Sequence, residues 1–495
     1  MTPATAPPLA DLVARRLGGM VLAASDEFFA PKERLLERAP PVFREGHYTD
    51  RGKWMDGWET RRRRGAGHDW AVLRLGLPGI VAAVVVDTTH FSGNHPAACS
   101  VDGLAAGADD DPELLDASAD WHELLPHTPL EPDLEQRFPV EVPLRVTHVR
   151  LSIYPDGGVA RLRMLGEPVP DLRRLAPDGR ADLAAAVNGA EVIACSDMSF
   201  ASSSNLLLPG DAVDMRDGWE TRRRRGPGHD WAVVRLAAAG AIERVEVTTT
   251  HYKGNHPESC ELEACLEPGA DASRVPEGGW WSVVPPSRLD PHARHVFAPS
   301  SPSPPATHVR LAIHPDGGVS RLRVWGRVSD DGWERCGLRW LNALPARQAE
   351  EELLACCGSR EWAGKLAASR PFATAEELAG VADKVWESLG PDGWLEAFDA
   401  HPRIGERSSS PHTTREQAGV RDADPAVIAA LAEGNRAYEA RFGHVFLVFA
   451  SGRGAAELLA ELRGRLGNDP ETELRVAAAE QRKITRLRLE RLFRP

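Results

Sequence analysis

The sequence predicts a multidomain protein in which two tandem all-β, jelly-roll-like sandwiches are followed by an all-α domain. A long polar motif occurs twice, which indicates two copies of one domain. Short strand-like segments separated by Gly/Pro turns surround each copy, a pattern typical of β-sandwiches. After Arg327 the apolar residues change to helical spacing. The length of 495 residues is consistent with roughly three domains.

The duplicated motif is the stretch Asp56–Leu75, DGWETRRRRGAGHDWAVLRL, which returns at Asp217–Leu236 with two of its twenty positions changed. Two other segments recur in the same order. The sequence HFSGNHP at 90–96 returns as HYKGNHP at 251–257, and 148–166 returns as 308–326, with its PDGG turn intact. The offset between copies stays at 160 or 161 residues, so these are tandem domains rather than solenoid units.

Strand predictions follow from the residue patterns of the first copy. Ile80–His90 is rich in β-branched residues and predicts a buried strand. Two alternating segments, His148–Tyr154 and Val159–Leu165, flank the turn 155–158 and predict a hairpin. Matching DEFFA at 26–30 to DMSFA at 197–201 completes the expected organisation: a flexible tail 1–16, repeat 1 over 17–170, a linker 171–184, repeat 2 over 185–328, a linker 329–337 and a helical domain 338–495.

Helix signals are strong in the C-terminal part. Thr374–Glu377 forms a capping box ahead of an apolar stripe that runs to Leu389. Asp424 and Pro425 open another helix, which Gly443 closes. A short apolar run, Val445–Ala450, is followed by two more helical segments, 454–466 and 471–493.

Composition excludes several classes of protein. The formal net charge of −13 argues against binding to nucleic acid or to an anionic membrane surface. No apolar run has the length of a membrane span, and the N-terminus lacks the apolar core of a signal peptide. The seven cysteines show no metal-finger spacing, so we expect free thiols in a reducing, cytoplasmic location. A homo-oligomer is left open.

The polar residues of the repeats form one set of site candidates, because a duplicated core usually keeps its apolar residues and lets the polar ones drift. Arginine forks match carboxylate and ureido oxygens, and Glu and His transfer protons near neutral pH. A small, anionic, amide-rich substrate fits such a set. The competing interpretation is a structural polar network at the sandwich rim. A divalent metal is possible, but no spacing indicates one. The candidates are Glu59, Arg61, His68, Asp69, His90, Asn94 and their copies Glu220, Arg222, His229, Asp230, His251 and Asn255.

The three duplicated motifs together resemble the allantoicase family over roughly residues 17–328. The resemblance implies two tandem jelly-roll repeats that hydrolyse allantoate to ureidoglycolate and urea. Either water attacks the carbon that bears a ureido group, or urea is first eliminated. One copy, both copies, or a site shared between the copies could carry the activity.

The helical domain has its own candidate, His401, which Pro402 places in a restrained turn. Taken alone, such a loop histidine is more often a surface residue. However, the segments HPRIG, TTREQAGV, FGHVFLVFASGR and EQRKITRLRLERL resemble 2-oxo-4-hydroxy-4-carboxy-5-ureidoimidazoline (OHCU) decarboxylase over about 338–493. The resemblance implies decarboxylation of OHCU to S-allantoin without a cofactor. It assigns His401, Glu416 and Arg488 as catalytic, and it assigns substrate binding to Pro402, Thr413, Thr414, Arg415, Gln417, Phe446, Leu447, Val448, Phe449 and Ala450.

The two resemblances fall in one pathway, the breakdown of urate, so the expected partners are the small molecules allantoate and OHCU. No segment resembles the enzyme that opens the allantoin ring, so direct channelling between the two sites is not expected. Two alternatives for the repeats remain: an enzyme for another ureido or guanidino acid such as ureidoglycolate, and a non-catalytic carbohydrate-type binding module. Release of urea from allantoate distinguishes them.

Overall fold

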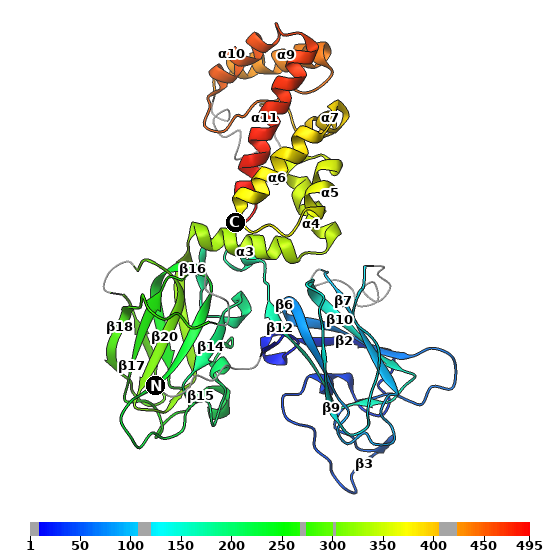
Figure 1. The fold of residues 1–495 in the computed structure, drawn as a ribbon, viewed down its shortest axis with the longest axis vertical. Helices are drawn as coiled ribbons and strands as arrows, with labels where there is room; N and C mark the ends of the chain where they lie inside the picture. The colour runs from blue at the N-terminus through cyan, green and yellow to red at the C-terminus, as the bar shows by residue number, and fades with distance from the viewer. Residues whose placement is uncertain (1–8, 107–119, 268–273, 300–302, 405–422) are drawn as a thin grey trace. The chain divides into compact units, whose positions relative to one another are not determined.

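The computed structural model describes residues 9–106, 120–267, 274–299, 303–404 and 423–495. These residues form two compact units, a β unit that ends at Ala343 and a helical unit that runs from Leu344 to Arg494. In Figure 1 the β unit is coloured blue through green, and the helices of the second unit run from yellow to red. Among the described helices, none combines the length and the apolar composition needed to cross a bilayer.

Repeat 1 is built around one long strand, β6, which spans Asp69–Asp87. The first part of β6 pairs with β10 and β2, and its second part pairs with β12 and β9, all antiparallel. The strand therefore belongs to both layers of the sandwich. The strands of repeat 1 are β1 (Ala10–Asp11), β2 (Met20–Ala24), β3 (Tyr48–Thr49), β4 (Gly52–Lys53), β5 (Trp58–Glu59), β6, β7 (Ala98–Leu104), β8 (His122–Pro129), β9 (Glu135–Pro139), β10 (Arg145–Tyr154), β11 (Gly158–Val159) and β12 (Arg161–Pro168).

Repeat 2 reproduces this arrangement around β16, Asp230–Thr248, which pairs with β20 and β14 and then with β22 and β19. The sheet order β13-β22-β16-β20-β17-β18 matches β1-β12-β6-β10-β7-β8 of repeat 1. The duplication inferred from the sequence is thus a duplication of topology. The other strands are β13 (Arg180–Asp182), β14 (Glu191–Cys195), β15 (Trp219–Glu220), β17 (Ser259–Cys265), β18 (Trp281–Arg288), β19 (Arg294–Phe297), β20 (Pro305–His314), β21 (Gly318–Val319) and β22 (Arg321–Val328).

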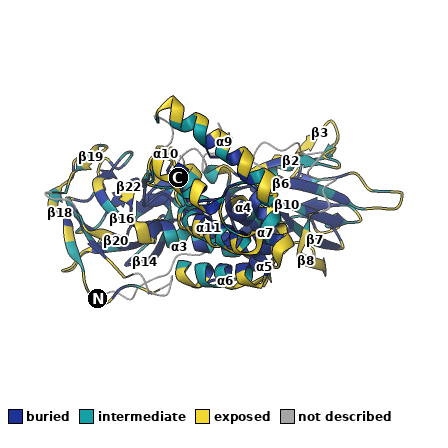
Figure 2. Ribbon diagram, turned by 90° about the horizontal axis from the view of Figure 1, so that it is seen from above, coloured by how far each residue is buried: buried dark blue, intermediate teal, exposed yellow. Residues whose placement is uncertain are grey.

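Each repeat has an apolar core of its own between its layers. Trp58 and Leu73 are fully buried in the core of repeat 1, and Trp219 and Val234 are fully buried in that of repeat 2. Figure 2 shows the strands β6 and β10 largely in dark blue, as expected for strands buried in a sandwich. The predicted fold class of the two repeats is confirmed.

The predicted hairpin at 148–165 is wrong, although both of its strands exist. β10 and β12 do not pair with each other, because β6 lies between them. The turn at 155–158 instead connects β10 with the segment that leads to β12, and both of these strands pair with β6. Its last residue, Gly158, begins the short strand β11, which pairs with β5. Alternation identified the strands correctly, but it could not identify their pairing partner.

The structure also differs from the predicted boundaries. β1 pairs with β12, so residues 10 and 11 belong to the first sheet rather than to a tail. A short helix, α2 (Leu172–Leu175), and β13 occupy the predicted linker 171–184. Helix α3 (Asp330–Ala343) covers the linker predicted at 329–337. A local difference separates the repeats: the stretch before the polar motif spans 37–55 in repeat 1, with the β3–β4 pair inside it, but only 208–216 in repeat 2.

The helical unit follows the predicted signals closely. Thr374 caps α6 by accepting a hydrogen bond from the Glu377 amide, and Asp424 and Gly443 cap the two ends of α9. The segment 445–450 has no helix or strand. The helices are α4 (Ala346–Cys357), α5 (Arg360–Ala368), α6 (Ala375–Ser388), α7 (Pro391–Asp399), α9 (Pro425–Phe442), α10 (Ala455–Arg465) and α11 (Pro470–Arg491).

Candidate active sites

The three duplicated motifs of repeat 1 meet at Gly158. This glycine pairs in register with Glu59 of the polar motif, and its amide donates to the Asn94 carbonyl at 2.8 Å. The Asn94 side chain in turn donates from Nδ2 to Glu59 Oε1 at 2.7 Å. The ring of Phe91 packs so closely over Gly158 that a Cβ there would lie 2.0 Å from a ring carbon. Three segments that are distant in sequence thus hold one Glu–Asn pair.

Repeat 2 holds the same pair by the same means. Asn255 Nδ2 donates to Glu220 Oε1 at 2.6 Å, and the Gly318 amide donates to the Asn255 carbonyl at 2.9 Å. Tyr252 replaces Phe91 over the glycine and donates its hydroxyl to the Met215 carbonyl. The Glu–Asn pair is therefore a property of the fold that both copies keep.

The carboxylate of the first pair has altered acidity. Burial raises the pKa of Glu59, and the hydrogen bond from Asn94 offsets part of that increase. A carboxylate with a raised pKa is a better proton acceptor at neutral pH. Glu59 and Asn94 also offer a second carboxylate oxygen and an amide oxygen as acceptors for N–H groups. The pair can therefore hold a ureido group and take a proton.

The aspartates and the first histidines among the site candidates contact residues outside the Glu–Asn pairs. Asp69 is buried, and it accepts from Ser25 and pairs with Arg63 at 2.5 Å; Asp230 does the same with Ser196 and Arg224. The His68 ring lies against Tyr154 with 4.7 Å between ring centroids, and His229 lies against His314 at 4.6 Å. Burial, with smaller contributions from nearby arginines, lowers the pKa of His68.

His90 and His251 stand at a tight turn beside the Glu–Asn pairs. Both adopt a left-handed backbone, with φ of 72° and 73°, which is uncommon for a residue other than glycine. Each ring approaches a carbonyl of the preceding loop, His90 that of Pro41 at 3.3 Å and His251 that of Ala212 at 2.8 Å. Strained backbone of this kind is often associated with functional sites.

One contact distinguishes the two copies. Arg61 forms an ion pair with Asp26 at 2.7 Å, whereas Arg222 donates to the Ser199 hydroxyl at 3.0 Å. Ser199 occupies the position of Phe28 in repeat 1, and its hydroxyl also donates to Asp197. The guanidinium of repeat 2 is therefore held by a neutral oxygen and that of repeat 1 by a carboxylate.

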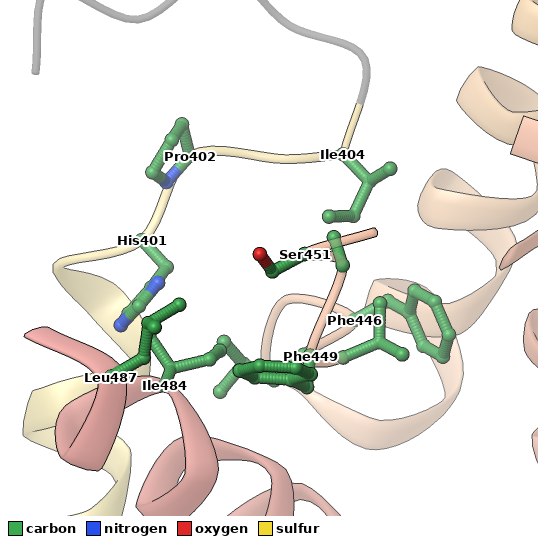
Figure 3. Close-up of a pocket in the computed structure, with 11 residues that line it drawn as sticks. His401, Pro402, Ile404, Phe446, Phe449, Ser451, Ile484 and Leu487 are labelled. Carbon is green, nitrogen blue, oxygen red and sulfur yellow. The ribbon is translucent and has the colours of Figure 1, made fainter. Parts of the chain in front are cut away.

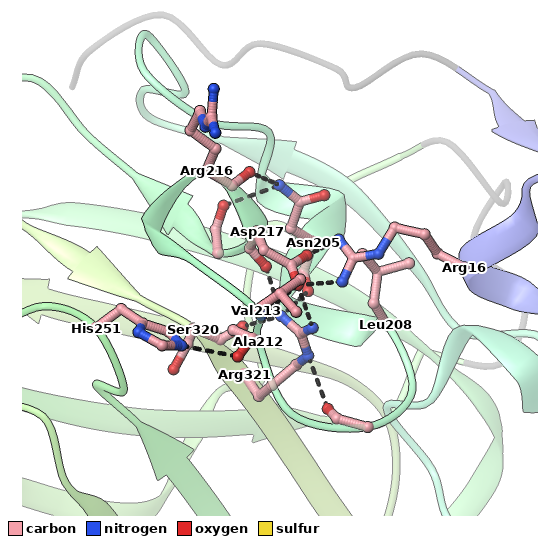
Figure 4. Close-up of polar contacts among 12 residues, drawn as sticks. Arg16, Asn205, Leu208, Ala212, Val213, Arg216, Asp217, His251, Ser320 and Arg321 are labelled. Carbon is pink, nitrogen blue, oxygen red and sulfur yellow. Dashed lines mark hydrogen bonds and ion pairs between the residues drawn. The ribbon is translucent and has the colours of Figure 1, made fainter. Parts of the chain in front are cut away.

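Sequence inspection overlooked the first residue of the motif. Asp56 pairs with Arg161 at 2.9 Å, and Asp217 pairs with Arg321 at 3.2 Å. Figure 4 shows the second network, in which Asp217 also accepts from the Val213 amide and from Arg16 of repeat 1. These contacts, together with the Arg63–Asp69 pair, support the competing interpretation of a structural polar network for part of the motif.

The described donors of the repeats do not fit a metal. Glu59 turns to Asn94, His68 to Tyr154 and His90 to Pro41, so the candidate ligands have different partners. Throughout the described residues, no three His, Cys, Asp or Glu side chains are grouped as a metal site requires.

The helical unit contains a pocket beside His401. Figure 3 shows His401 and Pro402 at one side, Ile404 and Ser451 at the other, and Phe449 near α11. The segment 446–451 forms one wall, and Ile484 and Leu487 of α11 close the pocket. Its lining is mostly apolar, with His401 and Ser451 as polar side chains. Predicted residues Pro402 and 446–450 lie here, whereas Ser451, Ile484 and Leu487 were not predicted.

Two groups of residues predicted for this pocket are not among the described residues that line it. Arg488 lies one turn along α11 from Ile484, is buried, and is not among the described residues that line the pocket. Its guanidinium is 3.5 Å from the Cys356 carbonyl. The other predicted residues lie outside the described ones, so their roles stay predictions: Thr413, Thr414, Arg415, Glu416 and Gln417.

Comparisons with known proteins separate the same two parts. A family model described as allantoicase repeat matches residues 10–169 and 181–329, and one described as OHCU decarboxylase matches 342–490. A probable allantoicase of Pseudomonas aeruginosa (strain UCBPP-PA14) is 50% identical over 319 residues, which are 64% of this chain and 95% of that protein. Probable allantoicase 2 of Burkholderia pseudomallei (strain K96243) is 49% identical and covers 63% of this chain and 93% of its own length.

Solved structures extend these comparisons. The crystal structure of allantoicase from Saccharomyces cerevisiae is 36% identical, with a TM-score of 0.55, and the match covers 64% of this chain and 92% of that one. A crystal structure of OHCU decarboxylase in the presence of (S)-allantoin is 40% identical, with a TM-score of 0.27, and the match covers 29% of this chain and 97% of that one.

Proposed function

The chain belongs to the allantoicase family and carries an OHCU decarboxylase domain after its two repeats, and on this premise we propose that it acts twice in urate breakdown. The β repeats hydrolyse allantoate to ureidoglycolate and urea. The helical domain converts OHCU to S-allantoin and CO2. The convergence of the three duplicated motifs on a Glu–Asn pair supports the first activity, because it places a proton acceptor beside groups that bind ureido N–H.

For the hydrolysis, we propose that the carboxylate of the Glu–Asn pair acts as general base. If water displaces urea at the central carbon of allantoate, the carboxylate takes a proton from the water and passes it to the nitrogen of the leaving urea. If urea is eliminated first, the carboxylate takes the proton of the remaining ureido N–H and passes it to the leaving urea, and water then adds to the C=N bond that forms. Both courses consume one water and yield ureidoglycolate and urea, and both need a base at this position.

Replacing Glu59 and Glu220 by Gln, singly and together, tests this proposal. Loss of a general base lowers the rate by about 10²–10⁴-fold, so we expect that loss of urea release in at least one single variant and in the double variant. The single variant that is inactive identifies the working copy. Glu45→Gln, at an exposed position of repeat 1, is the matched control. Urea release at the wild-type rate by the double variant would refute the assignment.

For the decarboxylation, we propose that His401 supplies the proton. Departure of CO2 leaves an electron pair on a carbon conjugated with the imidazolone ring, and protonation from one face of the pocket gives a single stereoisomer. The apolar lining of 446–450, Ile484 and Leu487 suits a site that excludes water from this carbanion. We further propose that Glu416 and Arg488 contribute to the decarboxylase site and that the decarboxylation needs no cofactor. Assays of both activities after exhaustive chelation test this and show whether the allantoicase repeats use a divalent metal.

Replacing His401 by Asn tests the second activity. We expect release of CO2 from OHCU to fall by at least about 100-fold, since the proton donor is lost. Urea release from allantoate by the same preparation should be unchanged, which shows that the loss is confined to the helical domain, and circular dichroism of the variant checks that this domain is folded. Undiminished formation of S-allantoin by the variant would exclude His401 as the donor.

The seven free cysteines support a further proposal, that the protein works in the reducing cytoplasm. Six of them are buried and one is half-buried. Cell fractionation with an antibody to the chain tests the location.

A further inference from the structure

The segment 445–450 is a largely buried stretch of backbone that belongs to no helix or sheet. Phe446, Val448 and Ala450 belong to the apolar core of the helical unit, and the same segment forms the pocket wall near His401. Backbone polar groups in such a place need partners, because an unpaired buried amide or carbonyl is costly. Helices supply none to a neighbour, since their own backbone groups are already paired. The Arg453 amide supplies a partner to the Ala450 carbonyl, and side chains supply partners at Leu447 and Phe449.

Arg465 of α10 holds one backbone carbonyl of the wall. Its Nη1 donates to the Leu447 carbonyl at 2.7 Å, and its guanidinium lies over the Phe446 ring at 4.7 Å from the centroid. Arg465 is 7% exposed and is kept in place by Glu473, which is fully buried and accepts from its Nε and Nη2 at 2.8 and 2.6 Å. The hydroxyl of Tyr438 also donates to Glu473.

The Arg465 guanidinium keeps its charge despite burial. Burial alone would lower the pKa of Arg465, but the hydrogen bond and the charge of Glu473 outweigh it, and the pKa is raised. Asn468 adds a hydrogen bond to Glu473 Oε2 at 2.7 Å. A charged guanidinium with a fixed orientation makes a stronger bond to a carbonyl than a neutral donor would.

Glu480 of α11 holds a backbone amide two residues further along the wall. Its Oε2 accepts from the Phe449 amide at 2.7 Å, while its Oε1 pairs with the Lys483 ammonium at 2.5 Å. Glu480 is 8% exposed, and it lies one helical turn before Ile484, which lines the pocket. Two charged side chains on two helices thus fix the carbonyl of Leu447 and the amide of Phe449.

We infer that Glu480 and Arg465 are positioning residues for the decarboxylation: they fix the wall 446–450 at the distance from His401 that the substrate requires. The inference rests on the proposed activity of the helical domain. Neither residue needs to touch the substrate, because each acts through the backbone of the wall. Displacement of a binding wall by an ångström is enough to weaken productive binding strongly.

Glu480 offers the sharper test, because its removal leaves no buried charge behind; its partner Lys483 is exposed. Glu480→Ala leaves the Phe449 amide without its acceptor, so we expect KM for OHCU to rise about tenfold or more while kcat changes less. Glu480→Gln keeps an acceptor oxygen for that amide and should restore KM to within about threefold of wild type. Such rescue would not follow from a merely structural role of the charge.

A matched control removes a different ion pair of the same helix, α11. Asp383 of α6 pairs with Arg482 of α11 at 2.7 Å but is not among the residues that line the pocket. Asp383→Asn removes an ion pair of α11 and should leave KM unchanged. If Glu480→Ala proves insoluble, Glu480→Asp replaces it, since the shorter side chain keeps the charge but cannot reach the Phe449 amide. The same rise in KM is expected.

Amide hydrogen exchange separates failure of the inference from failure of the proposed function. Exchange in the peptide 445–451 should be faster in Glu480→Ala and near wild type in Glu480→Gln. If wild type releases no CO2 from OHCU, the proposed function fails, and exchange alone still tests whether Glu480 holds the wall. If wild type is active and Glu480→Ala keeps its KM, or if the peptide exchanges as in wild type, the inference is overturned.

Discussion

His308 is a buried residue whose ionisation should make the stability of repeat 2 depend on pH. It is 3% exposed, and burial, with a smaller contribution from Arg235, lowers its pKa to about 4. In the unfolded chain a histidine has a pKa of about 6.5. Between these values the unfolded state binds more protons than the folded state, so stability is fully present above pH 6.5 and is lost as the pH falls toward 4.

We therefore expect the free energy of unfolding to decrease by up to about 3 kcal/mol from this residue between pH 7 and pH 4, the size expected for a shift of about two and a half pKa units. Urea unfolding at a series of pH values measures it. In His308→Gln this part of the pH dependence should disappear, whereas His122→Gln, at an exposed position, should behave as wild type. An unchanged pH dependence in His308→Gln would show that other groups dominate.

At the scale of elements, the contact between β5 and β11 decides where the Glu–Asn pair lies. Gly158 has no space for a side chain, since a Cβ would meet the Phe91 ring at 2.0 Å. Gly158→Ala should destabilise repeat 1 by about 1–3 kcal/mol through overpacking. It should also displace Asn94 from Glu59, because the Gly158 amide holds the Asn94 carbonyl. Thermal unfolding and urea release measure the two effects.

Gly93 provides the control for this substitution. It lies in the same loop as Asn94, and a Cβ there would meet nothing within 4 Å. Gly93→Ala should therefore leave both stability and urea release near wild type. Equal melting temperatures for Gly158→Ala and Gly93→Ala would mean that the ring of Phe91 can move aside without cost.

Elements also show how far the sequence could predict the structure. The ends of α9 follow from Asp424, Pro425 and Gly443, which act within a few residues of themselves, and they were predicted correctly. The pairing of β10 and β12 with β6 depends on residues about sixty to ninety positions away, so the local alternation at 148–165 suggested a hairpin that does not exist.

The residues of the candidate sites also differ in whether the sequence could predict them. The Glu, Asn and His of the duplicated motifs could be listed from the sequence, but the meeting of Glu59 and Asn94 at Gly158 depends on a strand pair between segments about a hundred residues apart. Arg465 and Glu480 were missed, because a charged residue on a predicted helix normally faces water. Only their contacts with Leu447 and Phe449 show that they face inward.

At the scale of the whole molecule, the two units should work independently. The helical unit has an apolar core of its own, which includes Leu431, Tyr438 and Leu462. We expect residues 344–495, expressed alone, to release CO2 from OHCU with a kcat/KM within about threefold of the full chain, and residues 1–343 to retain urea release. Steady-state assays of the separate pieces check this, with an equimolar mixture as control. Recovery of activity only in the mixture would indicate that the units depend on each other.

The shared strand at the centre of each repeat has a consequence for how the repeats unfold. Because β6 supplies backbone partners to β10 and β2 at one end and to β12 and β9 at the other, neither layer can melt while the other survives. We therefore expect each sandwich to unfold as a single cooperative unit. The amides of its central strand should then exchange with solvent together. Unfolding of the sandwich therefore also removes the Glu–Asn pair, because its three segments are held together by the strands of the same repeat.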